Sequence, residues 1–380
     1  MSNRVTMKDI AKRADVSVVT VSRALKNHPG LPKKTCQRIQ KIATKMGYRP
    51  NPMLSVLMAS LRRSRMGKGK RAGRRDNPGV DRNGPVIAFL FSNPNPEQFD
   101  DPGMPLGAMF AGARARGAEL GYKVERFRLD EPGMSETRMR QLLRARSIPG
   151  IIMAPLVDPI PEVDFDWSGF ACSTIGYSYT ASVLHRVAND QFLTMQLAVE
   201  KLVARGYRRI GLVMHRLSDE RTNHRWSGGF LSLPLLRGKE AARRVPVFYW
   251  EGETPAEGPA GLGDWMKRHE PDAVITVHPY VPEWIEQRGW RVPEDVGLVD
   301  LDLQGRGRTQ RAQTGREVSG VNRRHDLLGA MALDLVAEQL HLNEQGVPNR
   351  PKTVMLGGDW EEGATLRALW KAGSGVEGSG

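Results

Sequence analysis

Apolar residues recur three and four positions apart in three short segments of the first fifty residues, which is the spacing of amphipathic helices. Asp9 follows Thr6 by three positions as a capping box, and Ser17 can cap the next segment. Gly47 and Pro50 are typical of a helix end. The pattern predicts two short helices within residues 6–26 and a third over 33–46, with inward positions Ile10, Ala11, Ala14, Val21, Ala24, Leu25, Ile39, Ile42, Ala43 and Met46.

A fourth helical segment, residues 51–63, is apolar on almost every side, through Met53, Leu54, Val56, Leu57, Met58 and Leu61. Such a helix is unstable alone in water, so we expect it to pair with its twin in a dimer or with a surface met on binding. Residues 64–84 are rich in Arg, Lys and Gly without periodicity, which predicts a basic, flexible linker.

From residue 85 onward, short apolar runs alternate with segments of helical spacing. Strands are expected at residues 86–91, 123–127, 150–154, 171–175, 210–214, 245–249, 273–277 and 297–301. Helices are expected at residues 106–120, 135–146, 191–205, 261–269, 281–288 and 326–343. Alternation of this kind predicts parallel sheets with helices on both faces, and its length favours two α/β lobes. A ligand would then bind at the carboxyl ends of strands or between the lobes.

The charge of the chain is unevenly distributed. The 380 residues include 56 basic and 42 acidic side chains, a net charge of +14. Residues 1–84 hold 21 of the basic and only 4 of the acidic ones, so the remainder is close to neutral. A basic N-terminal part on a neutral body favours a polyanion-binding arm, whereas a merely solvated tail would not carry the helical order seen here.

Several classes of protein are disfavoured by the sequence. No apolar run approaches the roughly 20 residues of a membrane span, and the polar N-terminus has no signal-peptide core, so we expect a cytoplasmic protein. Cys36 and Cys172 match no metal or redox spacing, and Cys36 is expected in a core. We find no phosphate-binding glycine loop, nucleophile elbow or zinc motif, so we expect no catalytic residues, no metal and no cofactor.

The first three helices fit a helix-turn-helix, whose second helix enters the major groove. On that helix Val18 and Val19 point outward and suit thymine methyl groups, while Arg23 can reach a guanine; the alternative is that both valines belong to the core. The expected contacts to the DNA backbone are Thr6, Ser17, Thr20, Ser22, Lys33, Lys34, Thr35, Tyr48 and Asn51.

These residues closely resemble the lactose/galactose repressor family of bacterial regulators. The resemblance rests on the run from Thr6 to Leu25 and on residues 47–51, Gly-Tyr-Arg-Pro-Asn, and it continues more weakly through residues 185–190, 202–211, 293–297 and 363–366. It implies a periplasmic-binding-protein-like, two-lobed effector domain through which the protein dimerises. Asp15 replaces the usual turn glycine, and Pro32 stands where a serine usually caps the third helix.

The resemblance also implies a role for the fourth segment as a hinge helix that pairs with its twin in the minor groove. Met53, Leu54 and Leu57 would lie there, with Leu57 wedged between the central base pairs of a pseudo-palindromic operator. The alternative is that Leu57 only packs in the dimer. Leu54-Ser55 replaces the common Ala-Arg pair, which removes a charged contact, and the linker is longer than is usual in the family.

The same resemblance suggests effector-binding residues. Trp226 stands where relatives carry a sugar-binding arginine, with Arg225 beside it, and Asp302 stands at the position of an effector-binding aspartate. His278 replaces a common asparagine. Core packing is the alternative for Trp226, and a satisfied or surface position the alternative for His278. The full set of candidates, suited to a sugar, is Asn93, Phe99, Tyr177, Arg225, Trp226, His278 and Asp302.

The sequence thus predicts a multidomain chain: an all-α helix-turn-helix domain (1–50), a hinge helix (51–63), a basic linker (64–84), an effector-binding and dimerisation domain (85–370) and a flexible tail (371–380). Lobe 1 is expected to span about 85–187 and 318–349, and lobe 2 about 188–317 and 350–370. The expected function is a homodimeric, sequence-specific transcription regulator, a repressor controlled by a small sugar-like effector. The alternatives are a regulator without an effector and an enzyme fused to a DNA-binding domain.

Overall fold

The computed structural model describes residues 7–25, 31–46, 84–92, 96–156, 163, 165–232, 243–252, 258–303 and 316–368. The chain divides into two compact units, one of residues 1–77 with 339–344 and the other of residues 78–338 with 345–380, and each is described by itself. No helix within the described ranges is long and apolar enough to cross a membrane.

The N-terminal unit contains three helices, α1 (Met7–Ala14), α2 (Val18–Leu25) and α3 (Lys33–Lys45). They enclose a small core that includes Ile10, Val21 and Ile39, all inaccessible to solvent, and also Cys36. The expected helices and their inward positions are therefore confirmed. Asp15 adopts a left-handed φ of 51° between α1 and α2, a conformation that aspartate tolerates better than most residues. At α3 the Pro32 cap supplies no side-chain hydrogen bond.

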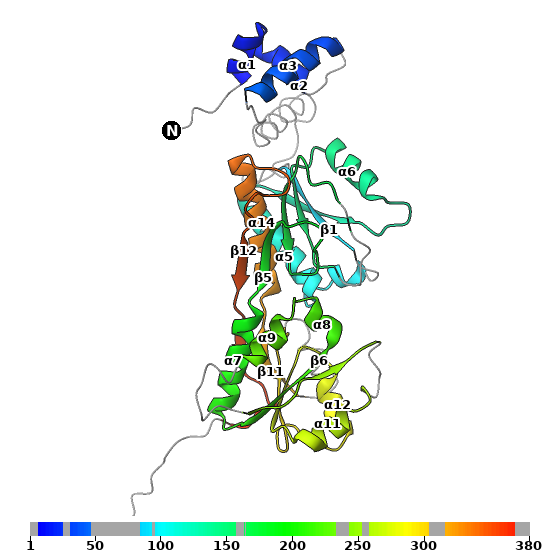
Figure 1. The fold of residues 1–380 in the computed structure, drawn as a ribbon, viewed down its shortest axis with the longest axis vertical. Helices are drawn as coiled ribbons and strands as arrows, with labels where there is room; N and C mark the ends of the chain where they lie inside the picture. Colours follow the sequence, from blue (N-terminus) through cyan, green and yellow to red (C-terminus); the bar gives the residue numbers. More distant parts are fainter. Residues whose placement is uncertain are drawn as a thin grey trace, which may run out of the picture. The chain divides into compact units, whose positions relative to one another are not determined.

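The second unit begins with a six-stranded sheet in the order β12-β5-β4-β3-β1-β2, in which all paired strands are parallel. Its strands are β1 (Val86–Phe91), β2 (Lys123–Arg128), β3 (Gly150–Met153), β4 (Ala171–Ile175), β5 (His185–Asn189) and β12 (Thr353–Leu356). Helix α6 (Glu136–Ala145) packs on one face of the sheet through Met139 and Leu143. Helices α5 (Pro105–Leu120) and α14 (His325–Leu342) lie side by side, and a short 3-10 turn, η1 (Pro96–Phe99), precedes α5 (Figure 1).

A second sheet follows in the order β13-β11-β10-β9-β6-β7, with β8 also paired to β6. Its strands are β6 (Arg209–His215), β7 (Arg243–Arg244), β8 (Phe248–Trp250), β9 (Ala273–Thr276), β10 (Gly297–Asp300), β11 (Ser319–Asn322) and the antiparallel β13 (Asp359–Glu361). One face is covered by α7 (Gln191–Ala204) and α9 (Arg225–Leu231), and the other by α11 (Leu262–His269) and α12 (Val281–Gln287). The short helix α8 (Arg216–Glu220) directly follows β6.

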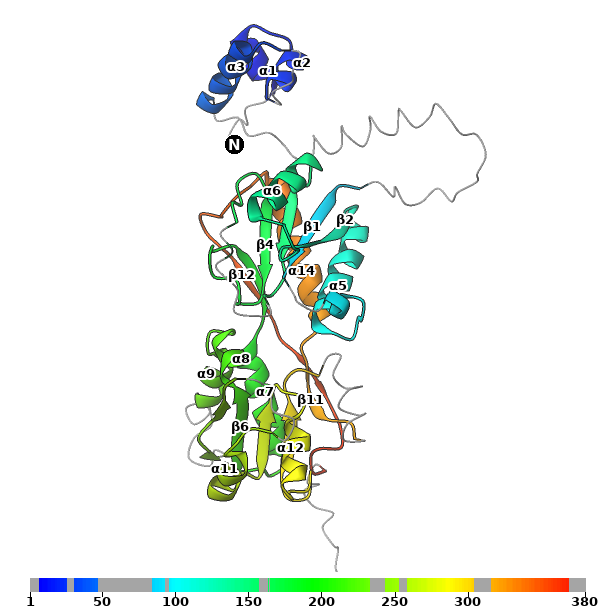
Figure 2. The ribbon, with the colours of Figure 1, turned by 90° about the vertical axis from the view of Figure 1, so that its right-hand side faces the viewer.

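The chain passes between the two sheets at three places within the described residues: from β5 to α7, from β11 to α14, and from β12 to β13 (Figures 1 and 2). This arrangement corrects the expected lobe boundaries. β11 lies in the second sheet although it was assigned to lobe 1, and β12 lies in the first sheet although it was assigned to lobe 2. The reason is strand pairing, since β11 extends β10 and β12 extends β5. Two α/β lobes, each built on a largely parallel sheet, are thus present, as expected.

Candidate functional site

The solvent-exposed surface of α2 is apolar at two successive positions. Val18 is 39% exposed and Val19 61% exposed, whereas Val21 and Ala24 of the same helix are 0% exposed. The alternative in which Val18 and Val19 belong to the core is therefore wrong. Arg23 is also exposed, one helical turn after Val19, so the two side chains share a face.

The hydroxyl of Ser17 caps α2. It accepts a hydrogen bond from the backbone N–H of Thr20 (3.1 Å) and lies 2.9 Å from the Thr20 hydroxyl. Ser17 and Thr20, both candidate contacts to the DNA backbone, therefore also fix the start of the helix that carries Val18 and Val19. Lys33 and Lys34 are exposed in the first turn of α3, and Thr35 is half-buried beside them.

Some candidate residues lie outside the described residues. They are the backbone contacts Thr6, Tyr48 and Asn51, the hinge residues Met53, Leu54 and Leu57, the loop residue Asn93, and the side chain of Ser22.

A cavity of about 380 Å³ lies where strands of both sheets end. The first lobe contributes residues that follow β3, β4 and β5 and the first turn of α5, and the second contributes residues of α8, α9 and the ends of β9, β10 and β11. The lining residues are Met104, Pro105, Leu106, Met109, Pro155, Ile175, Gly176, Tyr177, Ser178, Asn189, Gln191, Ser218, Arg221, Thr222, Trp226, Val277, Asp302, Arg323, His325 and Leu328. Carboxyl ends of parallel strands are the expected place for a ligand, and the volume is that of a small-molecule site.

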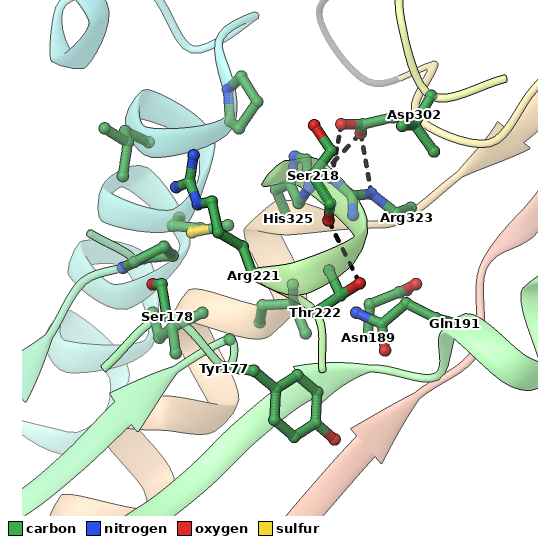
Figure 3. A pocket seen from close by; sticks show the side chains of 18 of the residues that line it. Tyr177, Ser178, Asn189, Gln191, Ser218, Arg221, Thr222, Asp302, Arg323 and His325 are labelled. Carbon is green, nitrogen blue, oxygen red and sulfur yellow. Dashed lines mark hydrogen bonds and ion pairs between the residues drawn. The ribbon is translucent and has the colours of Figure 1, made fainter. Parts of the chain in front are cut away.

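A buried charge cluster forms one end of this cavity (Figure 3). Arg323 holds Asp302 with two hydrogen bonds, from Nε to Oδ1 at 2.9 Å and from Nη2 to Oδ2 at 2.5 Å. The Nε2 atom of His325 lies 3.6 Å from Asp302 Oδ1. Asp302 therefore lines the cavity as expected, but its carboxylate orients a guanidinium as well as facing the ligand space.

Two aromatic candidates also line the cavity. Trp226 is 1% exposed and packs in the core of the second lobe, and it also forms part of the cavity wall. The guanidinium carbon of Arg323 lies 5.8 Å from the centre of its ring. Tyr177 lies against Arg225 (4.5 Å from guanidinium carbon to ring centre) and Arg186 (5.2 Å). Burial raises the pKa of Tyr177, and the charges of the two arginines oppose the shift, so its hydroxyl is protonated at neutral pH.

Three candidates do not line the cavity. Arg225 is next to Trp226 in sequence but packs on the Tyr177 ring. Phe99 packs instead in an aromatic cluster with Phe89, Phe91 and Phe110. His278 stacks on Trp284, with 5.2 Å between ring centres, and meets Trp250 edge to face. Phe99 and His278 lie outside the cavity for the same reason. Each ring packs against other aromatic rings, and this packing is more favourable than a position at the cavity mouth.

Several lining polar residues were not among the sequence candidates, namely Ser178, Asn189, Gln191, Ser218, Arg221, Thr222, Arg323 and His325. Asn189 belongs to the 185–190 motif that carries the family resemblance, so that motif could have indicated it. Arg323 and His325 follow β11, whose sequence Ser-Gly-Val-Asn has no apolar run to mark a strand. Within the described residues no group of three or more His, Cys, Asp or Glu side chains could hold a metal ion.

Comparison with known proteins places both parts of the chain. Residues 6–51 match the family of bacterial regulatory proteins, lacI family, and residues 199–366 match the periplasmic binding protein-like domain. The NTD biosynthesis operon regulator NtdR of Bacillus subtilis is 24% identical over 79% of this chain and 83% of its own length. The transcriptional repressor CytR of Escherichia coli is 50% identical, but over 13% of this chain and 14% of its own.

Solved structures share the fold. The transcriptional regulator CelR in complex with cellobiose superposes with a TM-score of 0.53 at 18% identity, over 95% of this chain and all of that one. The lac repressor dimer bound to operator and the anti-inducer ONPF gives 0.54 at 18% identity, over 96% and 100%. The matched families are regulators and binding domains, which confirms that the protein is not an enzyme. With its helix-turn-helix unit and its two-lobed binding domain, the chain belongs to the lacI family of DNA-binding transcription regulators.

Proposed function

We propose that this regulator is a repressor that binds a pseudo-palindromic operator as a homodimer in the cytoplasm, and that a small carbohydrate-like effector in the cavity controls its affinity for DNA. One observation carries the proposal: the same chain exposes an apolar and basic surface on α2 and encloses a polar cavity between two lobes. The α2 surface alone would suit a DNA-binding protein without a ligand, and the cavity alone would suit a binding protein without DNA. Together they favour DNA binding that responds to a small molecule.

On the DNA side, α2 lies in the major groove. Val18 and Val19 contact thymine methyl groups, and Arg23 donates to a guanine. Residues in or next to the first turns of α2 and α3 contact phosphates, namely Ser17, Thr20, Ser22, Lys33, Lys34 and Thr35. Thr6, Tyr48 and Asn51 are proposed as further phosphate contacts. The hinge residues Met53, Leu54 and Leu57 enter the minor groove, with Leu57 as the wedge.

On the effector side, the cavity combines an apolar wall with hydrogen-bonding groups. Trp226 and the side chains of Met109 and Leu328 suit the C–H face of a sugar ring. Asn189 and the Asp302–Arg323 pair suit its hydroxyls. CelR was solved with cellobiose, and another relative of this fold with D-xylulofuranose, which supports a carbohydrate-like ligand here.

Control of DNA binding follows from the position of the cavity. A ligand that contacts both lobes stabilises the arrangement of the lobes in which it fits best, and shifts operator affinity only by its differential affinity for the two states. The lining set includes residues of both lobes, as this scheme requires. The cavity is also the observation that favours an effector-controlled regulator over one without an effector.

A dimer is supported by exposed apolar side chains on one part of the second lobe. Phe192 and Leu193 at the start of α7 are 37% and 53% exposed, and Leu231 at the end of α9 is 46% exposed. The two helices pack together, since a Cβ at Gly229 of α9 would lie 3.4 Å from the Phe192 Cα. Grouped apolar side chains on a surface mark a contact site, and a second copy of the chain is the partner proposed.

The proposal is tested by selection of binding sites from random duplex DNA with the full chain. Enrichment of one two-fold symmetric sequence is expected, bound by a species with twice the mass of the chain. Ligand libraries are then screened for a change in affinity for that sequence. A failure to enrich any sequence contradicts specific DNA binding, whereas an enriched site that no sugar, nucleoside or sugar phosphate affects favours the regulator without an effector.

A further inference from the structure

Several polar side chains in the wall of the cavity are already held by hydrogen bonds within the protein. The Nε and Nη2 atoms of Arg323 donate to the carboxylate of Asp302. The hydroxyl of Thr222 donates to the backbone carbonyl oxygen of Asp219 at 2.9 Å. The fold thus supplies these lining atoms with partners, as is usual for buried polar groups.

Asn189 shows how fully a buried amide in this wall can be satisfied. It lines the cavity and is 3% exposed. Its Nδ2 atom donates to the carbonyl oxygen of Leu356 at 3.1 Å, and its Oδ1 atom accepts from the hydroxyl of Thr194 at 3.3 Å. Each end of the amide therefore has a partner within the protein, one in β12 and the other in α7.

Gln191, two positions further along the chain, differs from Asn189 in this respect. It also lines the cavity and is also 3% exposed, but its Oε1 atom is buried and accepts no hydrogen bond from any described residue. An unpaired buried acceptor costs free energy, because it has lost its contacts with water and gained none in return. The two amides lie close together in Figure 3. The Oε1 atom of Gln191 is therefore suited to a donor that enters the cavity.

The backbone around Gln191 is fixed by hydrogen bonds at the start of α7. The Oδ1 atom of Asp190 caps the helix and accepts from the backbone N–H of Leu193 at 3.0 Å. The backbone N–H of Asp190 donates to the carbonyl oxygen of Leu356 at 2.7 Å. Gln191 is the first residue of α7, where the chain passes from the first sheet to the second lobe. A ligand that bonds to Gln191 would therefore contact a connection between the lobes.

From the contrast between the two amides we infer that Gln191 is a specificity-determining residue, whose Oε1 atom accepts a hydrogen bond from one hydroxyl of the bound effector. A ligand without this hydroxyl leaves the buried oxygen unpaired and binds weakly. The ligand-free protein has the same unpaired oxygen, so Gln191 lowers its stability. The inference rests on the proposed effector site and names the residue that selects among hydroxylated ligands.

The first test needs no ligand and compares the thermal denaturation of two variants of the full chain. Gln191→Met keeps the length of the side chain and removes the unpaired oxygen, so the melting temperature should not fall and should rise by up to about 4 °C. Asn189→Leu is the matched control at the same burial. It removes an amide with two partners and should lower the melting temperature by about 4–8 °C. A fall in Gln191→Met would show that its amide supports the fold and would overturn the inference.

The second test identifies the hydroxyl. Ribose, xylose, arabinose, glucose, galactose, mannose and cellobiose are screened against the full chain by thermal shift in the absence of DNA. Each sugar that binds is then compared by calorimetry with its monodeoxy analogues, and at least one analogue should bind about 10- to 100-fold more weakly than its parent. The deoxyfluoro analogue at the same position should bind equally weakly, because fluorine donates no hydrogen bond. A deoxyfluoro analogue as tight as the parent would contradict the role of Oε1 as an acceptor.

The same ligands assign this discrimination to Gln191. In Gln191→Met the acceptor is absent, so the parent sugar and the discriminated monodeoxy analogue should bind within about threefold of each other. The loss of affinity caused by removal of any other hydroxyl should be the same as in the wild type. A change that merely loosened the cavity would instead alter the response to every hydroxyl.

The inference is overturned if no sugar of the panel binds to the wild type, if no hydroxyl is discriminated, or if the discrimination persists in Gln191→Met. The proposed function is judged by a different readout, the affinity for the operator. A sugar that binds through Gln191 without any change in operator affinity supports this inference and contradicts effector control.

Discussion

At the scale of single residues, Arg23 is the exposed arginine of the α2 surface, one turn from Val19. Because it is expected to donate to a guanine, Arg23→Ala should cost about 1–3 kcal/mol of binding free energy and relax the base preference at one position of each half-site. Binding-site selection with the variant measures this. An unchanged consensus sequence would contradict the base-reading role of Arg23.

The matched comparison is Lys34→Ala on the exposed start of α3. A lysine that contacts a phosphate contributes equally to all sequences, so this variant should weaken binding to every site and reduce the dependence of affinity on salt concentration. A change of consensus in Lys34→Ala would instead mean that this lysine reads bases.

Asp219 is a buried carboxylate whose ionised form the fold stabilises. Burial alone would raise its pKa, but hydrogen bonds from Ser227, Tyr249 and His224 outweigh burial and lower it. A group whose pKa is lower in the folded than in the unfolded state contributes stability above its ordinary pKa of 3.8 and loses it as the pH falls toward the folded value.

Tyr249→Phe removes the 2.7 Å hydrogen bond to Asp219. The variant should lose about 1.5–3 kcal/mol of unfolding free energy at neutral pH, the usual value for a hydrogen bond to a charged group. The difference from the wild type should shrink as Asp219 becomes protonated in both proteins at acidic pH. Urea denaturation at a series of pH values measures it, and a difference that does not depend on pH would show that only packing is lost.

Individual site residues differ in how well the sequence predicts them. Val18 and Val19 stand out because an exposed valine pair on an amphipathic helix breaks its pattern, and the structure exposes both. Trp226, Asp302 and Tyr177 line the cavity. Phe99 is also an aromatic residue in a segment after a strand, but its side chain packs in the core. The direction of a loop side chain depends on tertiary packing, which a local pattern does not contain.

At the scale of elements, strands with continuous apolar runs, such as β1 and β4, are predicted well because burial on both faces leaves a clear signal. β11, β12 and β13 have three or four residues each and mixed polarity, and the sequence pattern does not mark them. The short helices α8 and α9 are missed for the same reason. Three of the unpredicted lining residues, Ser218, Arg221 and Arg323, belong to or directly flank these weak elements.

The contact between α5 and α14 depends on two glycines. A Cβ at Gly329 of α14 would lie 1.8 Å from the carbonyl oxygen of Met109, and one at Gly112 of α5 would lie 1.8 Å from that of Asp326. Gly329→Ala forces the helices apart and should cost about 1–3 kcal/mol of unfolding free energy.

Thermal denaturation of Gly329→Ala measures this cost. Gly228→Ala on α9 is the matched control, because no atom lies within 4 Å of the added Cβ, and it should be neutral or stabilising. Equal melting temperatures for the two variants would contradict the close helix contact. Since Met109 also lines the cavity, Gly329→Ala should in addition weaken ligand binding.

At the scale of the whole molecule, the alternation of strands and helices predicts two α/β lobes, but not how the chain is shared between them. β11 and β12 lie in the opposite lobes to those expected from the sequence, because a break in a local pattern does not reveal which sheet a strand joins. The chain passes between the sheets near Asn189 and Arg323, and both residues line the cavity. The proposed ligand site is therefore built partly from the connections between the lobes, which is where a bound molecule could influence their arrangement.

The central claim is that a small molecule in this cavity controls DNA binding, and titration of operator affinity against a cavity ligand tests it most directly. The full chain is bound to its selected operator while the ligand concentration is raised past the dissociation constant measured without DNA. Operator affinity should change by a finite factor, about 5- to 150-fold for typical allosteric coupling, and then level off as the cavity saturates. An operator affinity that stays constant while the cavity is saturated would contradict the claim.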